Sequence, residues 1–170
     1  MASSLALLLA VAAAHKLAGF RSFAATLGDY RLLPARAVSF VAVLTILAEI
    51  ATASGLLVPA LRAPAAITAA LIFSAYGAAI AVNIARGRVD IDCGCSFGRS
   101  ADRLTVFLIW RNAALAGAAL VAAAPASARA LGAFDLAASA LFVVAAAAFY
   151  LTIEALRANA VQFDAMGHTR

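Results

Sequence analysis

An all-α fold, a polytopic bundle of about five transmembrane helices, is predicted for this chain from three observations. Of its 170 residues, 66% are apolar and only 12% are charged, whereas soluble domains are about half apolar and a quarter charged. The mean hydropathy is +1.00. Several apolar runs reach the roughly 20 residues with which a helix crosses the hydrocarbon core, and none shows the alternation of barrel strands.

Four of these runs meet the length of a membrane span without interruption: 37–58, 65–85, 104–124 and 134–156. A fifth run, from Ser3 to about Phe20, is interrupted by His15 and Lys16. No basic segment precedes it, as one would in a signal peptide, so we interpret it as an uncleaved first span. Lys16 then extends its ammonium group toward the membrane interface.

Together the spans occupy almost the whole chain, so residues 1–170 are predicted to form a single integral membrane domain. A four-helix core comes first, and an additional span at 134–156 follows it. The spans are rich in alanine and other small residues, for example "AALAGAAL" at 113–120. Small side chains allow helices in a bilayer to approach closely and to pack by dispersion.

Basic residues are distributed unequally between the two sides of such a bundle. The side that bears the loop around residue 93 contains Lys16, Arg21, Arg31, Arg36, Arg86, Arg88, Arg99, Arg103, Arg157 and Arg170, and the other side contains Arg62 and Arg129. The positive-inside rule therefore predicts that this loop is cytoplasmic. Arginines at helix ends beside anionic headgroups account for the net charge of +5, so we expect the lipid bilayer as partner and no nucleic acid.

The segment "DIDCGCSFGR" at 90–99 contains the only two cysteines, Cys93 and Cys95, with Gly94 between them. A disulfide between thiols so close in the chain closes a small, strained ring, and such a bond is easily reduced. Gly94 helps because it adopts backbone angles that are closed to other residues. We therefore predict a redox pair that acts through mixed disulfides, which would make the protein a thiol–disulfide oxidoreductase.

Two other interpretations of the pair remain open. In the first, the thiolates bind a metal ion together with Asp90, Asp92 or His15. A closed zinc site needs four ligands, although monovalent copper accepts fewer. In the second, the pair is structural or incidental. A structural disulfide is disfavoured because so short a loop removes little entropy from the unfolded chain.

Ionisable groups inside membrane spans are costly, so each is a candidate for function. Glu49 lies near the middle of the second span. The other polar groups lie toward the membrane face that bears the cysteine loop: Lys16, Asn83, Arg111 and Asn112. We expect Glu49, Arg111, Asn83 and Lys16 to form a buried cluster that supports the cysteines, with Glu49 paired to Arg111 or Lys16. Such a cluster either fixes helix register or serves as a proton relay or a contact for a quinone headgroup.

Several short motifs occur in a fixed order along the chain: Lys16 at the end of the first span, "YRLLP" at 30–34, Glu49, Gly55, "NIARGR" at 83–88, "DCGC" with Phe97 and Gly98, and "RN" at 111–112. From about residue 5 to 125 this set resembles the MauE family of methylamine-utilisation membrane proteins, which are similar in style to the DoxX-like group. One difference is Ser96, which separates the CGC motif from the Phe-Gly pair that follows it directly in the family pattern.

The resemblance implies an accessory factor of the inner (cytoplasmic) membrane that forms or isomerises disulfides during maturation of the methylamine dehydrogenase small subunit. It also implies two protein partners, namely a thioredoxin-like protein and an exported client that contains disulfides. Electrons would leave to the partner or to a membrane quinone. The alternatives are a non-enzymatic assembly or scaffold subunit and a metal-handling membrane protein. An exported client suggests thiol chemistry outside the cell, whereas the arginine distribution predicts a cytoplasmic cysteine loop.

Overall fold

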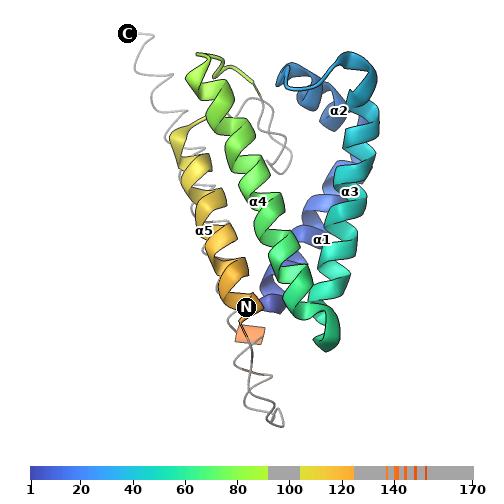
Figure 1. Cartoon of the computed structure of the whole chain (residues 1–170), viewed down its shortest axis with the longest axis vertical. Coiled ribbons are helices and arrows are strands. Elements are labelled where there is room, and N and C mark those ends of the chain that lie inside the picture. The colour runs from blue at the N-terminus through green and yellow to red at the C-terminus, as the bar shows by residue number, and fades with distance from the viewer. Residues whose placement is uncertain are drawn as a thin grey trace. The chain divides into compact units, whose positions relative to one another are not determined.

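The computed structural model describes residues 1–91 and 104–124, together with helical positions 137, 140, 141, 144, 148 and 152. Its elements, in chain order, are α1 (Ala2–Ala18), α2 (Phe20–Asp29), α3 (Ala35–Leu57), the 3-10 helix η1 (Pro59–Leu61), α4 (Arg62–Ala85) and α5 (Val106–Ala123) (Figure 1). The described residues contain no strand. The predicted all-α class is therefore confirmed.

In the described part of the chain, three helices are long and apolar enough to cross a membrane, or four if the bent pair of α1 and α2 forms one span. The three are α3, α4 together with η1, and α5. Their bounds agree within a few residues with the predicted spans at 37–58, 65–85 and 104–124. The predicted fifth span at 134–156 falls outside the described ranges, apart from the isolated positions named above.

The first predicted span differs from the structure, because α1 ends at Ala18 and the chain turns by 96° into α2. The turn keeps its backbone groups hydrogen-bonded: the Gly19 amide donates to the His15 carbonyl, and the Phe23 amide donates to the Gly19 carbonyl, both at 3.0 Å. The helix α2 was not predicted from the sequence. Its Thr26 is buried while Arg21 is exposed, an amphipathic pattern that is typical of helices at a membrane interface.

The "YRLLP" motif forms the turn between α2 and α3. Arg31 adopts a φ of 48°, and its amide donates to the Gly28 carbonyl at 3.0 Å. A residue in the left-handed region commonly ends a helix in this way. Pro34 follows with a ψ of 144°, in the extended conformation, and caps the start of α3. The motif therefore returns the chain into the bundle.

Residues Ala2–Ala126 form one compact unit, and Ser127–Arg170 belong to another. Inside the first unit, α1 packs mainly against α3 and α4 packs mainly against α5, while α3 and α4 join the two pairs. Small side chains lie at the centre of these contacts, since Ala42, Ala66, Ala69 and Ala119 are fully buried. Close approach through small residues is the expected means of helix packing in lipid.

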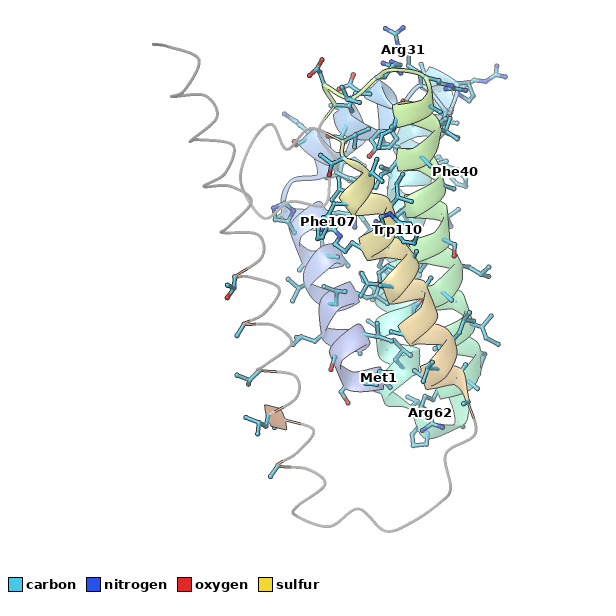
Figure 2. All side chains as sticks on the ribbon, turned by 90° about the vertical axis from the view of Figure 1, so that its left-hand side faces the viewer. Met1, Arg31, Phe40, Arg62, Phe107 and Trp110 are labelled. Carbon is cyan, nitrogen blue, oxygen red and sulfur yellow. The ribbon has the colours of Figure 1, made fainter. Side chains whose placement is uncertain are left out.

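The outward faces of the helices carry large apolar side chains. Phe40 is 69% exposed and Trp110 is 71% exposed, and both are labelled in Figure 2. Arg31 and Arg62 mark opposite ends of the bundle in the same view. Broad exposure of apolar side chains is unfavourable in water but favourable in hydrocarbon. The chain is therefore a multi-pass membrane protein whose surface contacts the bilayer.

Candidate functional site

The most deeply buried charged groups form an ion pair between α1 and α3. The Lys16 Nζ and Glu49 Oε1 atoms are 2.6 Å apart, and the two side chains are 4% and 0% exposed. Lys16 stands near the end of α1, just before the bend, and Glu49 lies in the middle of α3. The sequence allowed Arg111 or Lys16 as the partner of Glu49, and the structure pairs it with Lys16.

A third residue, Tyr76 of α4, completes the site. Its hydroxyl donates a hydrogen bond of 2.6 Å to Glu49 Oε1, the same oxygen that accepts from Lys16. Tyr76 was not among the site residues predicted from the sequence. The signal that could have identified it is a tyrosine in the middle of an apolar span, because a tyrosine hydroxyl buried in lipid or protein usually has a hydrogen-bond partner.

Aromatic rings surround the Lys16 ammonium group. Its Nζ atom lies 5.5 Å from the centroid of the Phe23 ring and 5.2 Å from that of Tyr76. A cation over the face of an aromatic ring is attracted by the ring quadrupole, and the attraction grows when water is excluded. Phe23 belongs to α2, so the bend after α1 brings one of these two rings to the cation.

The balance of donors and acceptors at this site is uneven. An ammonium group has three donor hydrogens, and among the described residues Glu49 is the one hydrogen-bond acceptor of Lys16. Conversely, Glu49 Oε2 is buried and has no hydrogen-bond partner in the described part of the chain. A buried polar atom without a partner is costly, so its persistence is commonly connected with function or with a bound molecule.

A cavity of about 80 Å³ lies beside this ion pair. The lining residues come from α1, α2, the α2–α3 turn, α3 and α4: Lys16, Phe23, Thr26, Leu27, Tyr30, Leu32, Thr45, Tyr76, Ala79 and Ile80. Most of them are apolar. The Thr45 hydroxyl already donates to the Val41 carbonyl at 2.8 Å, so it is engaged as a donor within α3. Among the described residues that line the cavity, Lys16 is the one with a cationic side chain.

The amide side chains expected in the polar cluster lie on α4 and α5. Asn83 is fully buried and donates to the Ala79 carbonyl at 3.0 Å. Asn112 is also buried and donates to the Leu108 carbonyl at 2.8 Å. Each bond joins a residue to the preceding turn of its own helix. Both amide groups therefore support α4 and α5 locally, and the site around Glu49 is formed by α1, α3 and α4.

Arg111, the other cation expected in the cluster, lies on α5 beside Asn112 and is half-buried. Because Glu49 accepts from Lys16 and Tyr76, Arg111 is not its ion-pair partner. Among the described residues no group of three or more His, Cys, Asp or Glu side chains could hold a metal ion. Asp90 is exposed, whereas Asp92, Cys93 and Cys95 lie outside the described residues.

The ends of the cysteine loop are held together at the same end of the bundle as α2 (Figure 1). The Leu104 amide donates to the Val89 carbonyl at 2.9 Å, which joins the residues before and after the loop. Leu104 also belongs to a buried cluster with Tyr30, Ile80 and Leu108. Tyr30 and Ile80 line the cavity as well. The base of the loop and the cavity wall therefore share side chains.

Comparison with known proteins gives a consistent result. Residues 1–125 match the family described as methylamine utilisation protein MauE. Over 122 residues the chain is 46% identical to the methylamine utilization protein MauE of Paracoccus versutus. The aligned residues make up 72% of this chain and 66% of that protein. The corresponding protein of Methylophilus methylotrophus is 44% identical over 120 residues, or 70% of this chain and 63% of that protein.

A more distant relative, the methylamine utilization protein MauE of Methylorubrum extorquens, is 37% identical over 138 residues, which cover 78% of this chain and 72% of that protein. The chain spans slightly less than two thirds of the length of the Paracoccus versutus and Methylophilus methylotrophus proteins. No solved structure matches the chain. The region that matches the family contains all of the helices from α1 to α5.

Proposed function

The chain belongs to the MauE family, and on that premise we propose that it is a membrane accessory protein of methylamine utilisation that exchanges thiols and disulfides through Cys93 and Cys95. The names of its relatives support the role in methylamine utilisation. The apolar helices support action within a membrane.

One observation carries the proposed thiol chemistry. The only two cysteines of the chain are separated by one glycine, and the loop that contains them begins and ends at residues joined by the Leu104–Val89 hydrogen bond. Two thiols so close in sequence form a strained, reducible disulfide. We infer that such a pair exchanges with a thiol or a disulfide of another protein.

The proposed reaction is disulfide exchange. A thiolate of Cys93 or Cys95 attacks one sulfur of a partner disulfide, which forms a mixed disulfide and releases one partner thiolate. The second cysteine then attacks its neighbour in the mixed disulfide, so the CGC pair becomes the disulfide and the partner becomes a dithiol. The reverse sequence oxidises a partner. In either direction one disulfide is lost and one is formed, so the number of electrons is conserved.

The family resemblance suggests the location and the partners in this proposal. The protein resides in the inner (cytoplasmic) membrane, exchanges disulfides with a thioredoxin-like protein, and serves an exported client that contains disulfides. Lys16, Glu49, Asn83 and Arg111 support the exchange from below the loop. The Asn83 carbonyl accepts from the Arg88 amide at 2.9 Å, next to Val89 at the base of the loop. The cavity beside Lys16 shares Tyr30 and Ile80 with that base.

Trapping of the mixed disulfide tests the proposal. Cys93→Ser and Cys95→Ser variants are expressed separately in a methylamine-utilising bacterium, cells are quenched with acid and alkylated, and covalent partners are identified by mass spectrometry. We expect one single variant to accumulate a disulfide-linked, thioredoxin-like protein, because the resolving thiol is missing. Ser96→Ala, a change in the same loop that retains both thiols, is the matched control and should accumulate no covalent adduct.

The double variant Cys93→Ser/Cys95→Ser separates exchange from a scaffolding role. Under the proposal it fails to mature methylamine dehydrogenase in the same cells, while the protein is still found in the membrane. Normal maturation with the double variant would reject thiol exchange and would support a scaffold subunit.

A further inference from the structure

The cavity beside Lys16 has the properties of a binding site for a neutral hydrogen-bond acceptor. Lys16 is 4% exposed and is one of the residues that line the cavity. Its ammonium group donates to one acceptor among the described residues. Its charge is already balanced by Glu49 at 2.6 Å. A second anion here would leave an uncompensated buried charge, which is strongly unfavourable. The site therefore favours a carbonyl oxygen over a phosphate or a carboxylate.

The walls of the cavity restrict the rest of the ligand. Phe23, Tyr30 and Tyr76 contribute aromatic rings, and Ala79 and Ile80 contribute aliphatic surface. Two of these rings lie close to the Lys16 ammonium, at 5.5 Å for Phe23 and 5.2 Å for Tyr76. Aromatic walls favour a flat conjugated ring, which can stack or meet them edge to face. The surrounding apolar helices favour a ligand that arrives from the lipid.

The size of the cavity sets the depth to which such a ring can enter. The volume is about 80 Å³ and the cavity is partly open, whereas an enclosed cavity of about 150 Å³ accommodates benzene. One edge of a substituted ring fits, and the remainder of the ring stays at the opening. A carbonyl on that edge would be brought to the Lys16 ammonium.

We propose that this cavity binds the carbonyl edge of a lipid-soluble quinone, with Lys16 as the hydrogen-bond donor and Glu49 as the residue that positions Lys16. A quinone is a neutral, flat, conjugated dicarbonyl compound that dissolves in lipid, so it meets each of the requirements above. Lys16 contacts the ligand directly. Glu49 acts through Lys16, because it pairs with the ammonium and does not line the cavity.

A redox role for this site rests on the proposed function. The thiols of Cys93 and Cys95 would lose two electrons and two protons as their S–S bond forms, and the quinone would gain both to become a quinol. The overall change is dithiol plus quinone to disulfide plus quinol, which balances. The shared residues Tyr30 and Ile80 connect the cavity with Leu104 at the base of the cysteine loop.

A direct titration tests binding without thiol turnover. The full chain is reconstituted in phosphatidylcholine nanodiscs and titrated with decylubiquinone by isothermal calorimetry, with empty nanodiscs as reference. We expect saturable binding to the wild type. Ala79→Leu, which fills the cavity, should weaken the affinity by roughly tenfold or more, and Lys16→Met should do the same because the donor is lost.

Two control variants accompany these changes. Ala78→Leu alters the exposed neighbour of Ala79 on α4, and Arg21→Met removes an exposed cation of α2; both should bind as the wild type does. Absence of saturable binding by the wild type, or equal affinities of Ala79→Leu and Ala78→Leu, would overturn the proposal. If Lys16→Met does not fold, the comparison of Ala79→Leu with Ala78→Leu still tests the proposal.

The two proposals can fail separately. Quinone binding with no mixed disulfide in cells would reject thiol exchange and leave the site intact. Mixed disulfides in cells with no quinone binding would reject the site and leave the exchange function intact.

Discussion

Glu49 holds the site together because one of its oxygens accepts two hydrogen bonds from two different helices. The Lys16 ammonium approaches Oε1 from α1, and the Tyr76 hydroxyl approaches the same atom from α4, each at 2.6 Å. Bonds to a charged acceptor are shorter and stronger than bonds between neutral groups. The carboxylate therefore stabilises the contact of α3 with both of its neighbours.

Removal of the Tyr76 hydroxyl measures the contribution of its hydrogen bond to Glu49. We expect Tyr76→Phe to lower the free energy of unfolding by about 1–2 kcal/mol, at the upper end of values for side-chain hydrogen bonds in membrane proteins because the acceptor is charged. Thermal or SDS-induced unfolding in detergent, followed by circular dichroism, provides the measurement. Thr68→Val is the control: its exposed hydroxyl bonds only to Pro64 in its own helix, so a loss as large as that of Tyr76→Phe would contradict the interpretation.

The ion pair should show strong coupling in a double-mutant cycle. Lys16→Met alone leaves the Glu49 carboxylate buried without its cation. This change should lower the free energy of unfolding by about 3–5 kcal/mol. Lys16→Met combined with Glu49→Met replaces the pair by apolar side chains of similar length, and we expect it to recover a large part of that loss. The same unfolding assay is used. Additive effects of Lys16→Met and Glu49→Met would mean that the 2.6 Å contact contributes no coupling.

At the scale of the elements, the connection between α3 and α4 depends on close packing at a glycine. A Cβ atom added to Gly55 would lie 2.9 Å from the Cβ atom of Ala65, and Ala65 is itself buried. Because the contacted atom is fixed to the backbone of α4, rotation of a side chain cannot relieve the overlap. The two helices would have to separate at this contact.

Gly55→Ala is therefore expected to destabilise the protein by about 1–3 kcal/mol, the usual cost of overpacking. Gly117→Ala is a matched control in α5, because a Cβ atom there meets no atom within 4 Å. It should cause no loss, since alanine favours the helix more than glycine does. Unfolding curves of the two variants provide the comparison. An equal loss of stability in both variants would show that the close contact of α3 with α4 at Gly55 is not the cause of the destabilisation.

For the molecule as a whole, the two ends of the bundle differ in charge. Lys16, Arg21, Arg31, Arg36, Arg86 and Arg88 lie near the α2 end, and Arg62 lies at the opposite end (Figure 2). Cationic side chains favour the cytoplasmic surface, where anionic lipids and the insertion machinery both retain them. The α2 end, which includes the base of the cysteine loop, is thereby predicted to face the cytoplasm.

Labelling of single cysteines tests this orientation. In a Cys93→Ser/Cys95→Ser background, Ser22→Cys reports on the α2 end and Ala60→Cys reports on the opposite end; both positions are exposed. With an impermeant maleimide added to intact spheroplasts, we expect labelling of Ala60→Cys and protection of Ser22→Cys until the membrane is opened. The reverse pattern would show that the cysteine loop faces outward, where an exported client would meet it.

The sequence predicted those properties that depend on local composition. A helix that crosses a bilayer must be about 20 residues long and apolar, so α3, α4 and α5 could be recognised within a few residues of their bounds. The helix α2 could not, because the break at Gly19 needs no unusual φ and leaves the backbone hydrogen bonds intact. The CGC pair could be identified as a candidate redox site because its chemistry requires only that the two thiols be neighbours in the chain.

Only the tertiary structure decided which polar groups meet. Composition indicated that Glu49 needed a partner, yet the choice of Lys16 over Arg111, the contribution of Tyr76 and the cavity beside them depend on how α1, α3 and α4 pack. The physical reason is that side chains distant in sequence pack together in one low-dielectric interior. Their packing decides which buried charges are paired and where a cavity remains. Hydropathy along the chain determines what lies in the membrane, and helix packing determines which residues can act together there.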